Sequence, residues 1–352
     1  MEKHILITGG AGFIGSHLCE LLVSQGHRVV AVDDLSTGKL ENLASLHGVA
    51  NFQFVRETIT NMQVLDRLTY EASLILHLAA VVGVKLIVED PVRTIQTNIM
   101  GTDAVLKAAN RYGVKVMIAS TSEVYGKGVT VPFREEDDCL IGPTSHSRWA
   151  YAASKSIDEF LGLAYQRQFG LPVVIMRFFN TIGPRQTERY GMVVPRFVRQ
   201  ALRGEALEVY GDGQQSRCFG HVADVVRAAT QLAWEPSAIG QVFNVGATEE
   251  ITIEDLAKRV IALTRSHSEI QFIPYDQAYA PGFEDMRRRV PSIEKISRLT
   301  GYQPSYTLDE MLESVISYER DQLMSGPPEL IELNQDSTDY SERVDHPRRD
   351  RW

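Results

Sequence analysis

Cysteine is scarce in this sequence of 352 residues. The three cysteines, Cys19, Cys139 and Cys218, stand far apart, with no CxxC pair and no histidine at metal-ligand spacing. Disulfide-stabilised domains and structural zinc sites both need cysteines that come in pairs. We therefore expect no disulfide framework, no bound metal, and a reducing compartment such as the cytoplasm.

Long apolar runs and an excess of positive charge are also missing. No window approaches the roughly 18 to 20 apolar residues of a membrane span, and the opening MEKHILITGGAGFIG lacks the basic start and unbroken apolar stretch of a signal peptide. Lys and Arg total 36 against 45 Asp and Glu, a formal charge of −9. Nucleic acids and anionic membranes attract basic surfaces. We therefore expect a small-molecule ligand and neither of those partners.

What the sequence does contain is a regular alternation of apolar runs with helix-length amphipathic segments. Hydrophobic residues make up 44% of the chain, as in ordinary globular proteins. Strands that helices cover on both faces read as continuous apolar runs instead of alternating patterns. The pattern predicts an α/β fold with a doubly wound parallel sheet, whose strands lie at 5–8, 29–32, 52–55, 74–78, 114–119 and 173–176.

From about residue 180 the pattern changes to loops rich in glycine and proline. This change predicts a smaller C-terminal α/β part that binds substrate, with strands at 207–210 and 242–245 and helices at 193–202, 223–234, 253–263 and 308–319. The last stretch, 326–352, combines three prolines, seven acids and four arginines with few apolar residues. Such a composition buries too little surface to order itself, so we expect a flexible tail over 323–352.

A glycine-rich turn follows the first predicted strand. The segment 9–15 reads GGAGFIG and is followed at once by a helical pattern. Glycines at these spacings allow a tight turn and let backbone N–H groups and the helix N-terminus approach a pyrophosphate. The turn therefore predicts a Rossmann-type dinucleotide site whose cofactor-binding residues include Gly9, Gly12, Phe13, Ile14 and Gly15.

Asp33 indicates which dinucleotide is bound. It ends the second predicted strand, eighteen residues after Gly15, where a carboxylate can bond the adenosine ribose hydroxyls. Asp34 follows directly, and no arginine stands in the next few residues. Two carboxylates beside the 2′ position repel a 2′-phosphate, so we expect NAD as the cofactor instead of NADP.

Tyr151 and Lys155 form the second informative pattern. They are four residues apart in YAASK and therefore lie on one face of a helix. A free tyrosine titrates at about 10, so it is a poor base near neutrality. A neighbouring ammonium stabilises the phenolate and makes it a usable base. The pair predicts an enzyme and disfavours the alternative of an NAD-binding regulatory protein.

Hydroxyl groups and one carboxylate follow the strand predicted at 114–119, in the segment STSEVYG. Open α/β sheets bind their ligands at the carboxyl ends of the strands. Thr121, Ser122 and Glu123 are therefore expected to face a substrate.

Five segments stand in the order seen in extended short-chain dehydrogenases that act on nucleotide sugars. They are GGAGFIG at 9–15, HLAA at 77–80, STSEVYG at 120–126, YAASK at 151–155, and RFFN through GPR at 177–185. The chain resembles that family over about residues 3–322. One departure is Glu57-Thr58-Ile59, where relatives carry an aspartate and a hydrophobic residue that contact adenine, so that contact is not expected here.

This resemblance implies roles for individual residues. Thr121 and Tyr151 would contact the sugar 4-hydroxyl, with Tyr151 as the base and Lys155 holding both it and the nicotinamide ribose. Asn180 and Arg217 would contact the diphosphate or the nucleotide. Ala79 would belong to the cofactor-binding residues, together with Asp33, Tyr151 and Lys155.

Three further features resemble UDP-glucuronate decarboxylases. They are Ser122-Glu123, the lead-in Arg148-Trp149-x-Tyr151, and the segment 282–285 leading to Arg289. Members of the family first oxidise C4 to a ketone, and a C5 carboxylate β to that ketone can leave as carbon dioxide. Arg289 would lie near the sugar carboxylate, and Glu123 or Arg289 could manage the proton at C5. A 4-epimerase of UDP-glucose or UDP-glucuronate and a GDP- or UDP-sugar dehydratase stay open.

The resemblance also implies a domain division and an assembly. Residues 1–180 would form the NAD-binding domain with the Tyr/Lys pair, and 181–322 mainly the nucleotide-sugar-binding part, with some segments returning to the first domain. Amphipathic segments at 94–112 and 151–165 correspond to the helices through which relatives form a four-helix bundle between subunits. A homodimer is expected.

Overall fold

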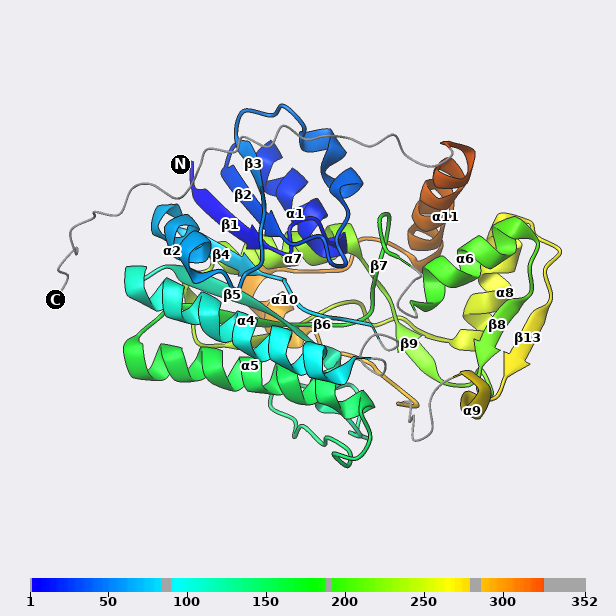
Figure 1. Cartoon of the computed structure of the whole chain (residues 1–352). Helices are drawn as coiled ribbons and strands as arrows, with labels where there is room; N and C mark the ends of the chain where they lie inside the picture. Colours follow the sequence, from blue (N-terminus) through cyan, green and yellow to red (C-terminus); the bar gives the residue numbers. More distant parts are fainter. Residues whose placement is uncertain (1, 84–89, 188–191, 279–285, 326–352) are drawn as a thin grey trace.

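A seven-stranded parallel sheet forms the centre of the computed structural model, which describes residues 2–83, 90–187, 192–278 and 286–325. The strand order is β11-β6-β5-β4-β1-β2-β3, and every neighbouring pair is parallel. The strands are β1 (His4–Thr8), β2 (Arg28–Asp33), β3 (Phe52–Arg56), β4 (Leu74–His77), β5 (Lys115–Thr121), β6 (Val173–Phe178) and β11 (Val242–Val245). The predicted doubly wound sheet is confirmed (Figure 1).

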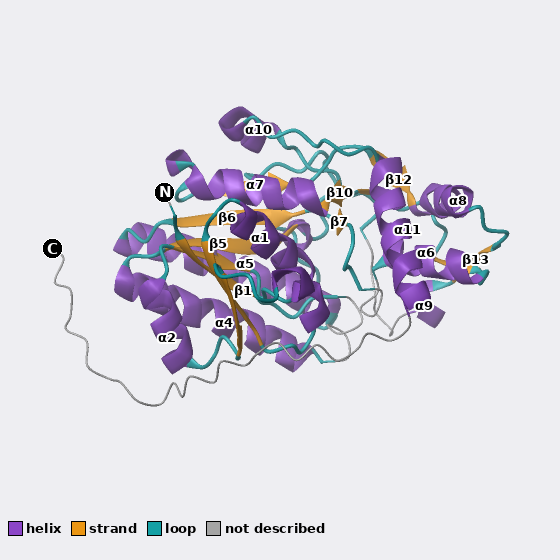
Figure 2. Cartoon of the chain, turned by 90° about the horizontal axis from the view of Figure 1, so that it is seen from above, coloured by secondary structure: helices purple, strands orange, loops and turns teal. Residues whose placement is uncertain are grey.

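Helices cover both faces of this sheet, as Figure 2 shows. One face packs against α1 (Phe13–Ser24), α7 (Val222–Trp234) and α10 (Glu294–Thr300), and the other against α2 (Met62–Glu71), α4 (Pro91–Tyr112) and α5 (Arg148–Phe169). Two hydrophobic clusters fill these layers, one around Leu18 and Val225 and one around Ile75 and Val105. Burial on both sides explains why the strands read as unbroken apolar runs.

Two of the covering helices, α4 and α5, lie side by side and have well-defined ends. Asp90 caps α4 by accepting a hydrogen bond from Arg93 N–H, and Pro91 occupies the first turn, where its missing N–H costs nothing. Gly113 and Gly170 end the two helices in the left-handed conformation that glycine adopts without strain. The segment with Tyr151 and Lys155 therefore lies near the start of a long helix with a defined end.

The smaller part has its own hydrophobic core, around Phe197, Leu256 and Leu312. It is built from α6 (Val193–Arg203), α8 (Ile253–Thr264), α9 (Tyr275–Ala278) and α11 (Leu308–Ser325), and from β8 (Leu207–Tyr210) paired with β13 (Ile270–Ile273) and β9 (Ser216–Cys218) paired with β12 (Glu250–Thr252). A short pair, β7 (Thr181–Ile182) with β10 (Gly220–His221), lies between the two parts. Three 3₁₀ turns complete the elements: η1 (Leu40–Leu46), η2 (Ser122–Tyr125) and η3 (Pro236–Ala238).

The position of β11 in the central sheet does not follow its place in the sequence. The strand follows the start of the second half of the chain, yet it pairs with β6 at the edge of the central sheet. The helix α7, which precedes β11, packs on the same sheet beside α1. Both elements thus belong with the central sheet, because their apolar residues are buried in the core that covers it.

The end of the chain differs from the sequence prediction in one respect. A helix was expected over 308–319, and α11 runs on to Ser325, so the first three residues of the predicted tail are helical. The rest of the predicted tail and the segment 282–285 lie outside the described residues. Within the described part of the chain, no helix is both long and apolar enough to cross a membrane.

Candidate active site

The glycine turn between β1 and α1 leaves no space for side chains. Gly9 has a φ of +71°, and a Cβ there would lie 2.8 Å from the backbone nitrogen of Ala79. A Cβ on Gly15 would lie 2.1 Å from the carbonyl oxygen of Gly9. The helix α1 begins after Gly12 without a side-chain cap, so its first N–H groups have no partner within the helix, while Phe13 and Ile14 pack partly buried against the core. This arrangement fits a bound pyrophosphate.

Asp33 is held at the carboxyl end of β2, next to this turn. Its carboxylate accepts hydrogen bonds from Ala11 N–H at 3.0 Å and from Leu35 N–H at 2.8 Å. Burial raises the pKa of Asp33, while these backbone donors oppose that rise. The carboxylate is thus fixed beside the mouth of the turn, where the sequence pattern expected it.

Glu57 begins the segment in which the adenine contact of relatives is not expected here, and its carboxylate is engaged locally. Its carboxylate accepts hydrogen bonds from Thr58 N–H at 2.8 Å and from the Asn61 side chain at 2.9 Å. Asn61 in turn caps the N-terminus of α2. Glu57 therefore stabilises the turn in which it lies.

Thr121 and Tyr151 meet where β5 ends and α5 begins. The Thr121 hydroxyl hydrogen-bonds the Tyr151 hydroxyl, and its oxygen also accepts Glu123 N–H at 3.2 Å. Burial of the phenol raises the pKa of Tyr151, and the Glu123 carboxylate raises it further, while Thr121 and Arg289 lower it. Tyr151 is therefore protonated in the free protein, and an added positive charge is needed to make it a base near neutral pH.

Glu123 lies between two guanidinium groups. Its carboxylate is 2.7 Å from Arg289 Nη2 and 3.1 Å from Arg148 Nη2, and all three side chains are largely buried. These arginines, with a contribution from Arg217, outweigh the effect of burial and lower the pKa of Glu123 to about 2. The group is ionised at physiological pH. Two guanidinium charges against one carboxylate leave this corner of the site positively charged.

Residues from the smaller part complete that corner. Arg289 Nη1 lies 3.4 Å from Asn180 Oδ1, and Asn180 donates to the carbonyl oxygen of Cys218 at 3.2 Å. Arg217, on β9, donates to the carbonyl oxygens of Ser216 and Met286 at 2.7 and 2.8 Å. The structure thus brings the predicted substrate-binding residues to one place. Ser122, by contrast, is buried at the start of η2.

Two charged residues that the sequence analysis did not assign to the site belong to it. Arg148, one turn before Tyr151, contacts Glu123, and the Arg148-Trp149 lead-in was a usable signal for it. Asp158 lies three residues after Lys155, and its carboxylate is 2.6 Å from Lys155 Nζ, with both side chains buried. A carboxylate at a buried helical position was the signal for Asp158.

A second buried ion pair supports the end of β5 from behind. Arg177 on β6 makes two hydrogen bonds with Glu159 of α5, and the Glu159 carboxylate also accepts the Ser120 hydroxyl at 2.5 Å. The Arg177 guanidinium stacks over the buried ring of Tyr125 at 4.8 Å. This network fixes β5, α5 and η2 relative to one another.

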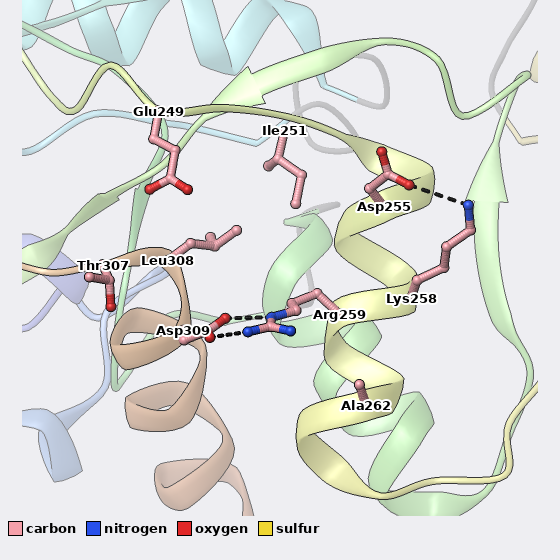
Figure 3. A pocket seen from close by; sticks show the side chains of 9 residues that line it. All are labelled: Glu249, Ile251, Asp255, Lys258, Arg259, Ala262, Thr307, Leu308 and Asp309. Atoms are coloured by element: carbon pink, nitrogen blue, oxygen red, sulfur yellow. Dashed lines mark hydrogen bonds and ion pairs between the residues drawn. The ribbon is translucent and has the colours of Figure 1, made fainter.

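A cavity of about 540 Å³ lies elsewhere, between α8 and α11 of the smaller part (Figure 3). Lys258 pairs with Asp255, and Arg259 with Asp309, as the dashed lines show. The remaining lining residues are Glu249, Ile251, Ala262, Thr307 and Leu308. None of the residues expected to bind cofactor or substrate lines this cavity.

Proteins that are similar in sequence are enzymes that act on nucleotide sugars, as the geometry of the site indicates. The family model described as GDP-mannose 4,6 dehydratase matches residues 6–315. A UDP-N-acetyl-alpha-D-glucosaminuronate decarboxylase from Bacillus cytotoxicus is 42% identical over 91% of this chain and 99% of its own length. UDP-glucuronic acid decarboxylase 1 from Danio rerio is 39% identical over 90% of this chain and 72% of its own.

A solved structure shows the same architecture. The UDP-glucuronic acid 4-epimerase from Bacillus cereus, in complex with UDP-glucuronic acid and NAD, has a TM-score of 0.81 and 31% identity, covering 90% of this chain and 99% of that one. The predicted family, the enzyme class and the NAD dependence of that class are confirmed by these relatives. The chain therefore belongs to the extended short-chain dehydrogenase/reductase family of NAD-dependent enzymes that modify nucleotide sugars.

Proposed function

We propose that this protein decarboxylates a UDP-linked uronic acid through a 4-keto intermediate, with UDP-glucuronate as its substrate. The observation that carries the proposal is the positive corner around Glu123, Arg148 and Arg289, directly beside Thr121 and Tyr151. An oxidising centre and a carboxylate-binding corner thus adjoin one another. The decarboxylases named above are consistent with this reading.

The residues of the glycine turn, with Asp33 and Ala79, fit a dinucleotide. Side chains at Gly9 or Gly15 would clash with the backbone of Ala79 or Gly9, so the glycines keep the turn tight, and the Asp33 carboxylate accepts Ala11 N–H of the same turn. Bound NAD would supply the acceptor for the hydride that leaves C4. Its positively charged ring and the Lys155 ammonium together would lower the pKa of Tyr151.

The oxidation step uses Tyr151 and Thr121. The Tyr151 phenolate takes the proton of the sugar 4-hydroxyl, while the Thr121 hydroxyl holds both oxygens in place by hydrogen bonds. Lys155 keeps the phenolate ionised. The product of this step is a ketone at C4.

The decarboxylation step uses the positive corner. Arg289 and Arg148 lie on either side of Glu123 and would bind the substrate carboxylate through charge-assisted hydrogen bonds. Loss of carbon dioxide leaves the electron pair as an enolate conjugated with the C4 ketone. Since Glu123 has a pKa of about 2, it stores no proton at neutral pH and is not the donor to C5 in this state. In this proposal Glu123 orients the two arginines, and C5 takes its proton from water beside Arg289, whose guanidinium stays charged.

The phosphates and the nucleotide would meet Asn180 and Arg217, while Ser122 stays a predicted substrate-binding residue beside Glu123. Asn180 contacts Arg289, and Arg217 on β9 donates to the carbonyl oxygen of Met286, three residues before Arg289. We accordingly propose the division expected from the sequence, with 1–180 as the NAD-binding domain and 181–322 mainly as the nucleotide-sugar-binding part.

Mass analysis of the nucleotide sugars after incubation with UDP-glucuronate and NAD tests this function. We expect a product lighter by one carbon dioxide, and no such product with Tyr151→Phe. A product of unchanged mass but different retention would indicate a 4-epimerase, and loss of water a dehydratase. Either result would overturn the decarboxylase proposal.

The 42% identity to the UDP-N-acetyl-glucosaminuronate enzyme favours a second candidate substrate with an acetamido group at C2. The same incubation with UDP-N-acetylglucosaminuronate decides between the two substrates. A larger kcat/KM for the acetamido sugar would replace UDP-glucuronate as the substrate and keep the reaction type.

We further propose a homodimer formed through α4 and α5. The outer faces of these adjacent helices expose large apolar side chains: Val92, Ile95, Met100, Ile157 and Phe160, the last with 70% of its surface exposed. Contiguous exposed apolar surface marks an interface. Light scattering is expected to give a dimer for the native chain and a monomer for Phe160→Glu.

We also propose that the protein acts in the cytoplasm. Its three cysteines are free thiols, which fits a reducing compartment.

A further inference from the structure

Asp158 is a fully buried carboxylate that the mechanism above does not use. It lies on the same face of α5 as Tyr151 and Lys155, seven residues after the first and three after the second. The distance from its Oδ2 to Lys155 Nζ is 2.6 Å, and the exposed fractions of the two side chains are 0% and 3%. Lys155 thus lies on the helix between the base and a carboxylate.

Burial and charge explain what this carboxylate does for the lysine. Taking an ammonium group out of water penalises its charged form, and a contacting carboxylate offsets that penalty. The carboxylate of Asp158 thus holds the ammonium group at this buried position. The site needs that charge to ionise Tyr151.

The groups behind Asp158 are neutral. Thr102 of α4 hydrogen-bonds the Asp158 carboxylate, and the Thr102 hydroxyl is 3.1 Å from His77 Nε2. His77 Nδ1 is 2.8 Å from the Thr8 hydroxyl. Burial, with the nearby Lys155 charge, lowers the pKa of His77 to about 3, so the imidazole carries no charge at neutral pH. Lys155 is therefore the cation that faces Asp158, while Glu159 is a further carboxylate close by.

Asp158 also acts on Tyr151 at a distance. Four groups of the site face the phenol: Glu123 and Asp158 raise the pKa of Tyr151, and Thr121 and Arg289 lower it. A negative charge beside Lys155 reduces the field that the ammonium exerts on the tyrosine oxygen.

We propose, building on the function proposed above, that Asp158 is a positioning residue for Lys155. It anchors the ammonium against β4 and α4 and limits how much of its positive charge acts on Tyr151. Tyr151 then stays protonated until the cofactor's own positive charge is present. The base is thereby activated together with the hydride acceptor and not before it.

Direct titration of Tyr151 tests this role. The chain contains 13 tyrosines, and ζ-carbon labelling with a Tyr151→Phe reference identifies the resonance of Tyr151 in NAD-saturated protein. In Asp158→Asn we expect the midpoint of Tyr151 ionisation to fall by about one pH unit, a tenfold change in the ionisation constant. The matched control is Asp103→Asn, which removes an exposed carboxylate from α4 where it pairs with Lys107. That control is expected to leave the midpoint unchanged.

An unchanged or higher midpoint in Asp158→Asn would overturn the proposal, as would the absence of any Tyr151 titration up to pH 11 in both proteins. If Asp158→Asn does not fold, Asp158→Ser removes the same charge from a smaller side chain and carries the test. Asp158→Glu is expected to restore the midpoint toward that of the native chain.

The titration uses no nucleotide sugar, so its result does not depend on whether the proposed function is correct. Conversion of UDP-glucuronate with an unmoved midpoint would overturn the role of Asp158 alone. A lowered midpoint in a protein that releases no carbon dioxide would overturn the proposed reaction and leave the role of Asp158.

Discussion

The cofactor side and the substrate side of the site are built in different ways. The cofactor side consists of one short stretch, the turn at 9–15, with Asp33 at the end of the next strand. The substrate side joins Glu123, Arg148, Asn180 and Arg289, which span more than 160 residues of the chain. The local shape of the backbone forms the cofactor side, and charge pairing between residues far apart in the sequence forms the substrate side. Mutations should therefore damage the two sides differently.

The largest effect is expected for Tyr151→Phe, which leaves both sides intact and removes the group that joins them. Loss of the base should lower kcat for UDP-glucuronate by about 10² to 10⁴-fold, while the dissociation constant for NAD, measured by calorimetry, stays within a few fold. Turnover close to that of the native chain would remove Tyr151 from its proposed role.

Glu123→Gln should reveal the charge pairing on the substrate side through its pH dependence. The pKa of Glu123 is lowered from 4.5 to about 2, so its ionisation stabilises the fold above pH 4.5, and this contribution disappears as the pH falls toward 2. A shift of this size corresponds to a contribution on the order of 3 kcal/mol.

Denaturant unfolding at pH 7, 4 and 3 measures that contribution. The difference in unfolding free energy between the native chain and Glu123→Gln should be largest at pH 7 and shrink steadily with acid. A difference that is the same at all three pH values would contradict the pairing with Arg148 and Arg289.

Gly15→Ala should reveal the close packing on the cofactor side. The added methyl group would lie 2.1 Å from the Gly9 carbonyl oxygen, which is backbone and cannot turn aside. We expect a loss of roughly 1 to 3 kcal/mol in stability and weaker NAD binding. Gly26→Ala, at a position where a Cβ meets nothing within 4 Å but φ is +80°, separates backbone strain from this clash, and it should leave NAD affinity unchanged.

The smallest effect is expected for Glu57→Gln. Its carboxylate serves its own turn through Thr58 and Asn61, so stability should change by no more than about 1 kcal/mol. The dissociation constant for NAD should stay within about twofold of the native value. A loss of NAD affinity comparable to that of Gly15→Ala would show that Glu57 contacts the cofactor after all.

The sequence predicted much of the fold because its signals are local. The predicted strands 207–210 and 242–245 coincide with β8 and β11, and the helix expected at 193–202 ends one residue later as α6. The partner of β11 could not be predicted, since pairing at a sheet edge depends on where α7 packs and not on the strand's own residues.

The same distinction applies to the individual residues of the site. The backbone repeat alone places Tyr151 and Lys155 on one helix face, and the glycine spacing alone permits the turn at 9–15. The protonation state of Glu123, by contrast, could not be predicted from local sequence. The sequence analysis allowed it to manage a proton, and the two guanidinium groups beside it fix it as an anion.

By itself, then, the sequence determined the order of strands and helices, the glycine turn and the Tyr151–Lys155 spacing, because each depends on neighbours within a few residues. The tertiary structure decided that Arg148 and Arg289 flank Glu123, that Asp158 pairs with Lys155 in the buried interior, and that β11 completes the central sheet. Those features depend on which buried charges and apolar faces meet after packing. Electrostatic and packing energies act through space, so residues far apart in the chain can set each other's charge and position.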